Sequence, residues 1–409
     1  MSQPRTPRSP AGRRERGSAG NQQGAARMKQ GWETKTLGEL CEVFADGDWV
    51  ESKDQSPEGI RLIQTGNVGE GFFKDRAEKA RYISEATFKR LRCTEIVEGD
   101  CLISRLPDPV GRSCILPDTG ERMITAVDCT IVRFKPKQFL PAFFNLYSQS
   151  NDFLNTVAKE CTGTTRNRIS RSSLGRTPIP VPPLAEQQRI VGVLDEAFTG
   201  LATAQANVEK NLRNARALFE SHLQSVFTQR GKGWVEKTLG ETCEMYQPKT
   251  IGTKDLVPDG AYPVFGANGV IGRYNKFNHE EPQLLITCRG ATCGSVNISE
   301  PKSWVTGNAM VVRPLEHSLD LKFLEFVFRG GIDISKAITG AAQPQITRTN
   351  ISPLLIRFPK SLDEQAQLAA QFEDLATETQ RLARHYQQKQ AALTALKKSL
   401  LHDAFRGAL

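Results

Sequence analysis

Two long stretches of the chain carry hydrophobic residues at alternating steps of four and three residues. The first runs over residues 185–227 and the second over residues 363–405, and neither contains a proline. This spacing is typical of helices that pair as a coiled coil. At about 1.5 Å per residue, each helix is predicted to be roughly 65 Å long. Two such helices in one chain are predicted to pack on each other.

The predicted interface positions are mostly large and apolar. On the first helix they are Leu194, Phe198, Leu201, Val208, Leu212 and Phe219. On the second they are Phe372, Leu375, Leu382, Leu393, Leu396 and Leu400.

The chain outside these helices has a different pattern. Short β-branched and apolar runs, interrupted by Gly, Asn and Pro, lie within residues 59–105 and 262–290. Such runs predict strands and turns. Short helices are predicted at 85–92, 141–158 and 321–330. The predicted fold class is therefore α+β, with two mixed α/β domains joined by two long helices in an antiparallel coiled coil.

The chain is also a quasi-repeat. Residues 31–42 read GWETKTLGELCE and residues 233–244 read GWVEKTLGETCE, identical at nine of twelve positions. Residues 162–170 parallel residues 339–347, and Glu186-Gln187 parallels Glu364-Gln365. Such internal similarity indicates a duplicated unit with a pseudo-two-fold relation. The predicted boundaries are a tail (1–30), a first domain (31–183), a first helix (184–230), a second domain (231–359) and a second helix (360–409).

The charge is unevenly distributed. Seven basic residues and one acidic residue within residues 1–30 account for +6 of the net charge of +9. This segment is rich in Pro, Gly, Ser and Arg, and we expect it to be disordered. Met28 offers an alternative start of translation, whereas a genuine tail would add DNA affinity independent of sequence. The nine cysteines form no C-x-x-C pair, which favours reduced thiols in a cytoplasmic protein.

Motifs for catalysis are missing from the sequence. There is no P-loop, no H-E-x-x-H, no G-x-S-x-G and no adenine-methyltransferase signature. We therefore expect a protein that is not an enzyme, with no metal site and no membrane span.

Several motifs follow one another along the chain: the two Lys-Thr-Leu-Gly-Glu openings, Thr65-Gly66-Asn67, Gly99-Asp100-Cys101 and the Glu-Gln pairs at the helix starts. Together they resemble the motifs of the specificity subunit of type I restriction-modification systems. The resemblance implies two target-recognition domains that each read half of a bipartite DNA site, with helices that space them. It also implies two methyltransferase subunits that carry S-adenosylmethionine, and translocase/nuclease subunits that use ATP and Mg²⁺.

Base reading needs Arg, Asn and Gln side chains that reach into the major groove. Candidates lie mainly in the two loops that follow Gly163 and Gly340. The predicted DNA-binding residues of the first domain are Gln64, Asn67, Arg105, Arg112, Thr164, Thr165, Arg166, Asn167 and Arg168. Those of the second domain are Asn268, Arg273, Tyr274, Lys276, Arg289, Gln343, Gln345 and Arg348.

Three alternatives remain open from the sequence. A stand-alone DNA-binding regulator would bind its site without partners. A fused methyltransferase or nuclease would show activity in the isolated chain. A coiled-coil adaptor would have no use for two different globular domains.

Overall fold

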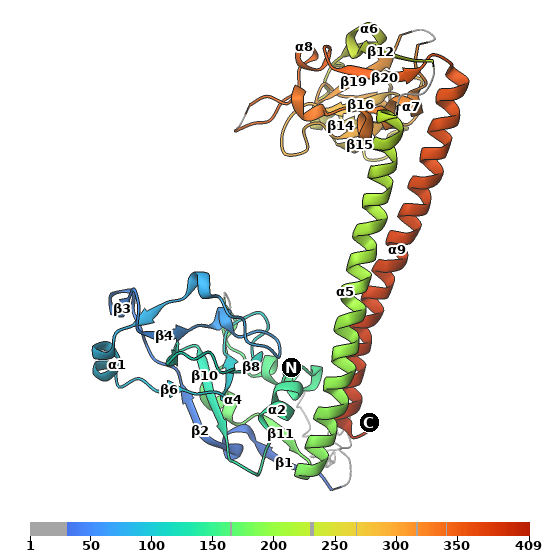
Figure 1. Cartoon of the computed structure of the whole chain (residues 1–409). Helices are drawn as coiled ribbons and strands as arrows, with labels where there is room; N and C mark the ends of the chain where they lie inside the picture. The colour runs from blue at the N-terminus through green and yellow to red at the C-terminus, as the bar shows by residue number, and fades with distance from the viewer. Residues whose placement is uncertain (1–30, 164–165, 230–232, 267, 316–317, 341) are drawn as a thin grey trace, which may run out of the picture. The chain divides into compact units, whose positions relative to one another are not determined.

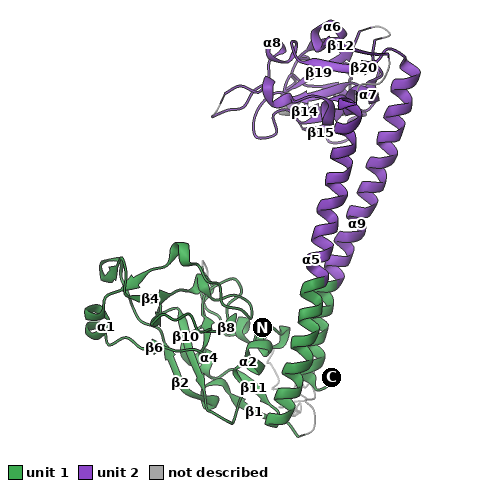
Figure 2. Cartoon of the chain, viewed as in Figure 1, with its two compact units in different colours: residues 1–203, 393–409 green, residues 204–392 purple. Residues whose placement is uncertain are grey.

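The computed structural model describes residues 31–163, 166–229, 233–266, 268–315, 318–340 and 342–409 (Figure 1). The predicted disordered tail, 1–30, lies outside the described residues. The chain divides into two compact units (Figure 2). Unit 1 contains residues 1–203 and 393–409, and unit 2 contains residues 204–392. Each unit thus combines a globular region with one part of each long helix.

The described residues of unit 1 form three sheets. The two-stranded sheet pairs β1 (Glu33–Thr36) with β11 (Pro178–Val181). The four-stranded sheet has the order β2 (Cys41–Asp46), β10 (Cys129–Phe134), β7 (Cys101–Ser104) and β8 (Ser113–Ile115). The five-stranded sheet has the order β3 (Gln55–Ser56), β5 (Tyr82–Ile83), β4 (Ile60–Ile63), β9 (Met123–Thr125) and β6 (Glu95–Ile96).

The described part of unit 1 also has four short α-helices: α1 (Glu85–Leu91), α2 (Pro141–Tyr147), α3 (Asn151–Lys159) and α4 (Arg171–Gly175). The single helix predicted over 141–158 is wrong, because α2 and α3 are separate helices. Ser150 starts the second of them, since its hydroxyl accepts the backbone N–H of Phe153 at 3.3 Å. A serine in this capping role favours a new helix start over an uninterrupted helix.

Unit 2 repeats the central part of this plan. Its two-stranded sheet pairs β12 (Trp234–Thr238) with β20 (Leu355–Pro359). The four-stranded sheet has the order β13 (Cys243–Tyr246), β19 (Ala309–Pro314), β16 (Leu284–Thr287) and β17 (Val296–Ile298). A three-stranded sheet has the order β15 (Gly269–Tyr274), β14 (Tyr262–Gly266) and β18 (Trp304–Val305). The helices are α6 (Leu239–Thr242), α7 (Leu321–Phe326), which continues as a π-turn, and α8 (Arg348–Ile351).

The repeated opening motif has the same structure in both units. Glu39 accepts hydrogen bonds from the backbone N–H of Thr36 (2.7 Å) and from its hydroxyl (2.8 Å). Glu241 accepts the equivalent bonds from Thr238, both at 2.7 Å. The Thr-Leu-Gly-Glu sequence therefore caps a short helical turn between two strands, which explains why it occurs twice.

The two long helices are α5 (Leu184–Thr228) and α9 (Leu362–Arg406). Both agree to within one residue at each end with the stretches of four-and-three spacing, 185–227 and 363–405. In unit 1 the start of α5 shares a core with the end of α9, where Leu194 and Leu401 are both buried. In unit 2 the end of α5 shares a core with the start of α9, where Phe227 and Phe372 are both buried. The helices therefore pair antiparallel, as predicted. No helix within the described ranges combines the length and apolar character of a membrane span.

Most predicted interface positions face inward. Those that are buried or partly buried are Leu194, Phe198, Leu201, Val208, Leu212, Phe219, Phe372, Leu375, Leu393 and Leu400. Leu382 is 37% exposed.

The prediction for Leu396 is wrong, because its side chain is 47% exposed. Lys397 takes the inward position instead. Its ammonium lies 4.8 Å from the ring centroid of Phe198 and donates to the side chain of Gln149 at 3.0 Å. Burial lowers the pKa of Lys397. The buried face of α9 turns here because Phe405 packs edge-on against Phe143 of α2, with ring centroids 5.2 Å apart.

A buried glutamine at the start of each long helix ties it to the adjacent globular region. In unit 1, Gln187 accepts the backbone N–H of Leu140 and donates to the carbonyl of Pro182, both at 2.9 Å. In unit 2, Gln365 accepts the N–H of Asp320 and donates to the carbonyl of Pro359, both at 2.8 Å. Both glutamine side chains are fully buried, which explains the repeated Glu-Gln pair.

Candidate nucleic-acid interface

The predicted recognition loops form equivalent structures in the two units. Loop 1 is the segment closed by the backbone pair Thr162–Arg168, and loop 2 is the segment closed by Thr339–Gln345. The closing hydrogen bonds are 2.9 Å in both directions in loop 1, and 2.9 and 2.8 Å in loop 2. The loops therefore correspond in position as well as in sequence.

A glycine is required at the start of each loop. Gly163 has φ +109° and Gly340 has φ +85°, and a Cβ on either would lie 2.5 Å from a backbone carbonyl oxygen of the same loop. A side chain is excluded there by both conformation and contact. Each loop is followed by a buried isoleucine, Ile169 or Ile346, that anchors it in the core. The described residues of each loop are thereby held on a fixed base.

The polar side chains of the loops are exposed, as base or phosphate contact requires. They are Arg166, Asn167 and Arg168 in loop 1, and Gln343 and Gln345 in loop 2. Thr164 and Thr165, also predicted to contact DNA, lie outside the described residues.

Unit 2 brings three predicted residues together in one cleft. Arg289 follows β16 and forms an antiparallel bridge with Gln345 of loop 2, and Gly290 donates to the carbonyl of Pro344 at 3.1 Å. Arg348, at the start of α8, lines the same cleft, whose volume is about 390 Å³. Its other polar lining includes Gln247 at the end of β13, which the sequence analysis did not identify. The cleft combines two cations with two amides, a set suited to phosphates and base edges.

The remaining predicted residues of unit 2 lie on or beside the separate three-stranded sheet. Arg273 donates to the carbonyls of Gly260 (2.5 Å) and Ala261 (2.9 Å). The ring of Tyr274 packs edge-on against Trp304. These contacts give both residues a role within the sheet. Asn268 and Lys276 are exposed.

In unit 1, the prediction that Arg112 contacts DNA is wrong. Only 8% of the residue is exposed. Its guanidinium donates four hydrogen bonds of 2.8–3.0 Å to backbone carbonyls, those of Thr65, Val68, Leu106 and Pro109. Burial lowers the pKa of Arg112, but the four carbonyls accept four of its five N–H groups. Arg112 therefore joins loops inside unit 1.

The predicted residue of the Thr65-Gly66-Asn67 motif also acts internally. Asn67 is 8% exposed. Its amide donates to the carbonyl of Lys74 at 2.9 Å and accepts the backbone N–H of Gln64 at 3.0 Å. This geometry removes Asn67 from the predicted DNA-binding set, while the side chain of Gln64 is partly buried.

Arg105 lies beneath loop 1 rather than on its surface. Its side chain is 4% exposed, donates to the carbonyl of Val127 at 2.5 Å and pairs with Asp46 at 3.1 Å. Burial lowers the pKa of Arg105. Its backbone carbonyl accepts the N–H of Ile169 at 3.4 Å, so Arg105 supports the loop. The prediction of direct DNA contact at Arg105 is wrong because the guanidinium is buried below the loop, where it contacts Val127 and Asp46.

Acidic residues pair with the exposed arginines around loop 1. Asp128 lies 2.9 Å from Arg168, and Asp46 lies 3.8 Å from Arg171. Neither acid was predicted from the sequence, because neither lies in a repeated motif. They limit the positive charge of this surface and restrict the conformations of its arginines.

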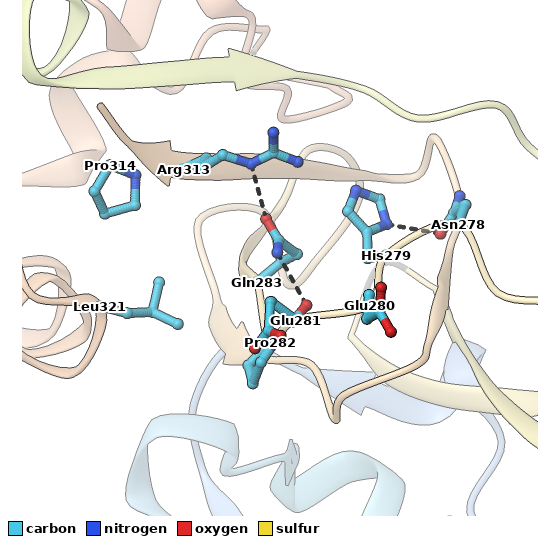
Figure 3. Close-up of a pocket in the computed structure, with 9 residues that line it drawn as sticks. All are labelled: Asn278, His279, Glu280, Glu281, Pro282, Gln283, Arg313, Pro314 and Leu321. Atoms are coloured by element: carbon cyan, nitrogen blue, oxygen red, sulfur yellow. Dashed lines mark hydrogen bonds between the residues drawn. The ribbon is translucent and has the colours of Figure 1, made fainter. Parts of the chain in front are cut away.

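A second pocket in unit 2, of about 440 Å³, surrounds His279 (Figure 3). One ring nitrogen of His279 bonds to the hydroxyl of Tyr246 at 2.8 Å and the other to Asn278 at 2.7 Å. Burial lowers the pKa of His279, and so does the nearby cation Arg313. Because both ring nitrogens are occupied, the imidazole serves the internal network.

Comparison with known proteins follows the same division of the chain. A family model described as type I restriction modification DNA specificity domain matches residues 29–210 and 231–390. The chain is similar to the specificity subunit of the type I restriction enzyme EcoprrI from Escherichia coli, with 26% identity over 199 residues, 47% of this chain and 48% of that protein. It is also similar to the putative type I restriction enzyme MjaX specificity subunit from Methanocaldococcus jannaschii, with 22% identity over 268 residues, 63% of this chain and 59% of that protein. The chain thus spans about half the length of the first relative and somewhat more of the second.

Two solved structures share the fold. One is a chain from a study of complex assembly and conformational transition of the type I R-M system. It has a TM-score of 0.78 and 19% identity, over 94% of this chain and all of that chain. The other is the HsdS subunit from Thermoanaerobacter tengcongensis, with a TM-score of 0.59 and 19% identity, over 93% of this chain and 98% of that chain.

Proposed function

Because the chain belongs to the family of type I restriction-modification DNA specificity domains, we propose that it is the DNA-recognition subunit of a type I restriction-modification complex. Each unit reads one half of a bipartite site in double-stranded DNA. The chain itself carries out no chemistry and directs partner enzymes to the site.

The observation that carries this proposal is the pair of equivalent loops with different side chains. Loop 1 presents Arg166, Asn167 and Arg168, whereas loop 2 presents Gln343 and Gln345. Arg pairs bidentately with guanine, and Gln or Asn with adenine. A duplicated scaffold with different reading groups is suited to two half-sites of different sequence.

The partners follow from the family. We propose that two methyltransferase subunits bind this chain and carry S-adenosylmethionine, and that restriction/translocase subunits use ATP and Mg²⁺. The setting is cytoplasmic. A one-to-two ratio of this chain to methyltransferase in the purified complex is the expected stoichiometry.

The test is an exchange of one recognition region. Residues 32–180 are replaced by the first region of another family member, and the methylated sequence is determined with the reconstituted complex. We expect one half-site to change and the other to stay the same. A change in both halves would contradict independent reading. Tight, specific binding by the chain without methyltransferase would favour a stand-alone regulator instead.

A further inference from the structure

The repeat defines which residues of the two units occupy the same position. The carbonyl of Arg105 accepts the N–H of Ile169 in unit 1, and the carbonyl of Cys288 accepts the N–H of Ile346 in unit 2. Arg105 and Cys288 are therefore equivalent in the backbone that supports the loops.

The same backbone positions identify a second equivalence. The N–H of Arg105 donates to the carbonyl of Asp128 at 2.9 Å, and the N–H of Cys288 donates to the carbonyl of Asn308 at 3.4 Å. Asp128 and Asn308 thus occupy the same turn, directly before β10 and β19. Arg168 and Gln345 are also equivalent, because each closes its loop.

The turn position and the loop-closing position both differ between the units. Unit 1 has Asp128 with Arg168, and unit 2 has Asn308 with Gln345. An anion with a cation in one unit thus corresponds to two neutral amides in the other. The two positions thus differ in charge in a matched way, which is what a shared role predicts.

The geometry of the charged pair suits a positioning role. Arg168 lies 2.9 Å from Asp128, with side chains 48% and 29% exposed. The contact is an ion pair without hydrogen-bond alignment, since Asp128 Oδ1 is buried and has no hydrogen-bond partner. The N–H groups of Arg168 therefore remain available to an incoming acceptor. The carboxylate also weakens the attraction of this position for phosphate, which favours a contact with a base.

We infer that Asp128 is a positioning residue that holds Arg168 ready to read one guanine in the half-site of unit 1. In unit 2, Asn308 and Gln345 form the neutral counterpart, which reads adenine at the equivalent position. The base identities follow from the bidentate pairing of Arg with guanine O6 and N7, and of Gln with adenine N6 and N7. This inference rests on the proposed function, which supplies the DNA.

The test uses the full chain in its complex with the methyltransferase subunits. The bipartite site is first selected from randomised duplexes with the unaltered complex. Binding is then measured on that site and on duplexes changed at each single base pair. Asp128→Asn is expected to lower discrimination about 5-fold to about 100-fold at one position of the unit 1 half-site. Binding to unrelated DNA is expected to stay equal or become tighter.

The double variant Asp128→Asn with Arg168→Gln gives unit 1 the residues of unit 2. We expect its preference at that one position to change from guanine to adenine, while the unit 2 half-site stays the same. Arg171→Gln is the matched control, because Arg171 also pairs with an acid but belongs to α4. It is expected to reduce the salt dependence of binding without altering base preference.

Three outcomes would overturn the inference. They are full base discrimination in Asp128→Asn, an equal loss of affinity for all sequences in that variant, and an unchanged base preference at that position in the single variant Arg168→Gln. Thermal unfolding of each variant separates these outcomes from a folding defect, and Arg168→Gln alters only an exposed side chain. If the unaltered complex selects no bipartite site, the proposed function fails. If it selects one and these variants leave its preferences intact, only the inference fails.

Discussion

The buried glutamine at the start of α5 provides a direct test of how the recognition region is held on the helix. Gln187→Leu keeps nearly the same volume but removes both polar groups of the side chain. The N–H of Leu140 and the carbonyl of Pro182 would then lose their partners, now at 2.9 Å. Each buried backbone group left unsatisfied costs about 1–3 kcal/mol, so we expect a loss of about 2–6 kcal/mol.

The assay is thermal unfolding of the full chain by calorimetry. In a unit of this size, 1 kcal/mol corresponds to roughly 2–4 °C, so the transition of unit 1 is expected to fall by at least about 4 °C. Gln188→Leu is the control, because Gln188 is the neighbouring residue of the same type and is exposed. Its effect is expected to stay within about 0.5 kcal/mol. Equal melting temperatures for the two variants would refute the reasoning.

Three further predictions concern the helices, the interior and pH. Inserting four residues near Asn207 lengthens α5 by about 6 Å and is expected to lengthen the unread spacer of the DNA site by one or two base pairs; an unchanged optimum in methylation assays on graded spacers would show that the helices do not set the spacing. Arg112→Leu removes four hydrogen bonds from the guanidinium to backbone carbonyls. At about 0.5–1.5 kcal/mol for each hydrogen bond, we expect a loss of at least about 2 kcal/mol, a lower midpoint of urea unfolding and an unchanged base preference in the folded fraction. A loss of base preference with unchanged stability would contradict the internal role of Arg112. Burial raises the pKa of the Asp48 carboxyl from 3.8 to about 6, so the folded state binds more protons than the unfolded state between these pH values. The stability that this difference contributes is present below about pH 4 and is lost as the pH rises through about 6. Asp48→Asn should flatten that part of the stability profile from pH 4 to 8, and a profile identical to that of the unaltered chain would argue against it.

The periodic and repeated parts of the chain could be predicted from the sequence because their causes are local. The steps of four and three residues determine one apolar face of a helix, and the bounds of α5 and α9 agree with the stretches of that spacing to within one residue at each end. The Thr-Leu-Gly-Glu motif and the glycines of loops 1 and 2 act within a few residues of themselves. Such features need no knowledge of distant parts of the chain.

Tertiary structure decided which of the individual polar side chains are buried and which are exposed. Arg112 and Arg168 are the same residue type, both near glycines in polar segments, yet one is enclosed by carbonyls and the other is exposed. Those carbonyls come from residues up to 47 positions away. No local pattern encodes that enclosure, so the sequence alone assigned both arginines to DNA.

The same reason explains the error on α9. Apolar spacing favoured Leu396 over Lys397, but the helix also contacts α2, and that second contact turns its buried face toward Lys397 and Phe405. The lysine is accommodated because its side chain lies against the ring of Phe198 and its ammonium donates a hydrogen bond to Gln149. The sequence thus determined that two duplicated units share paired helices. Only the packing of distant segments decided which side chains those units bury and which they present.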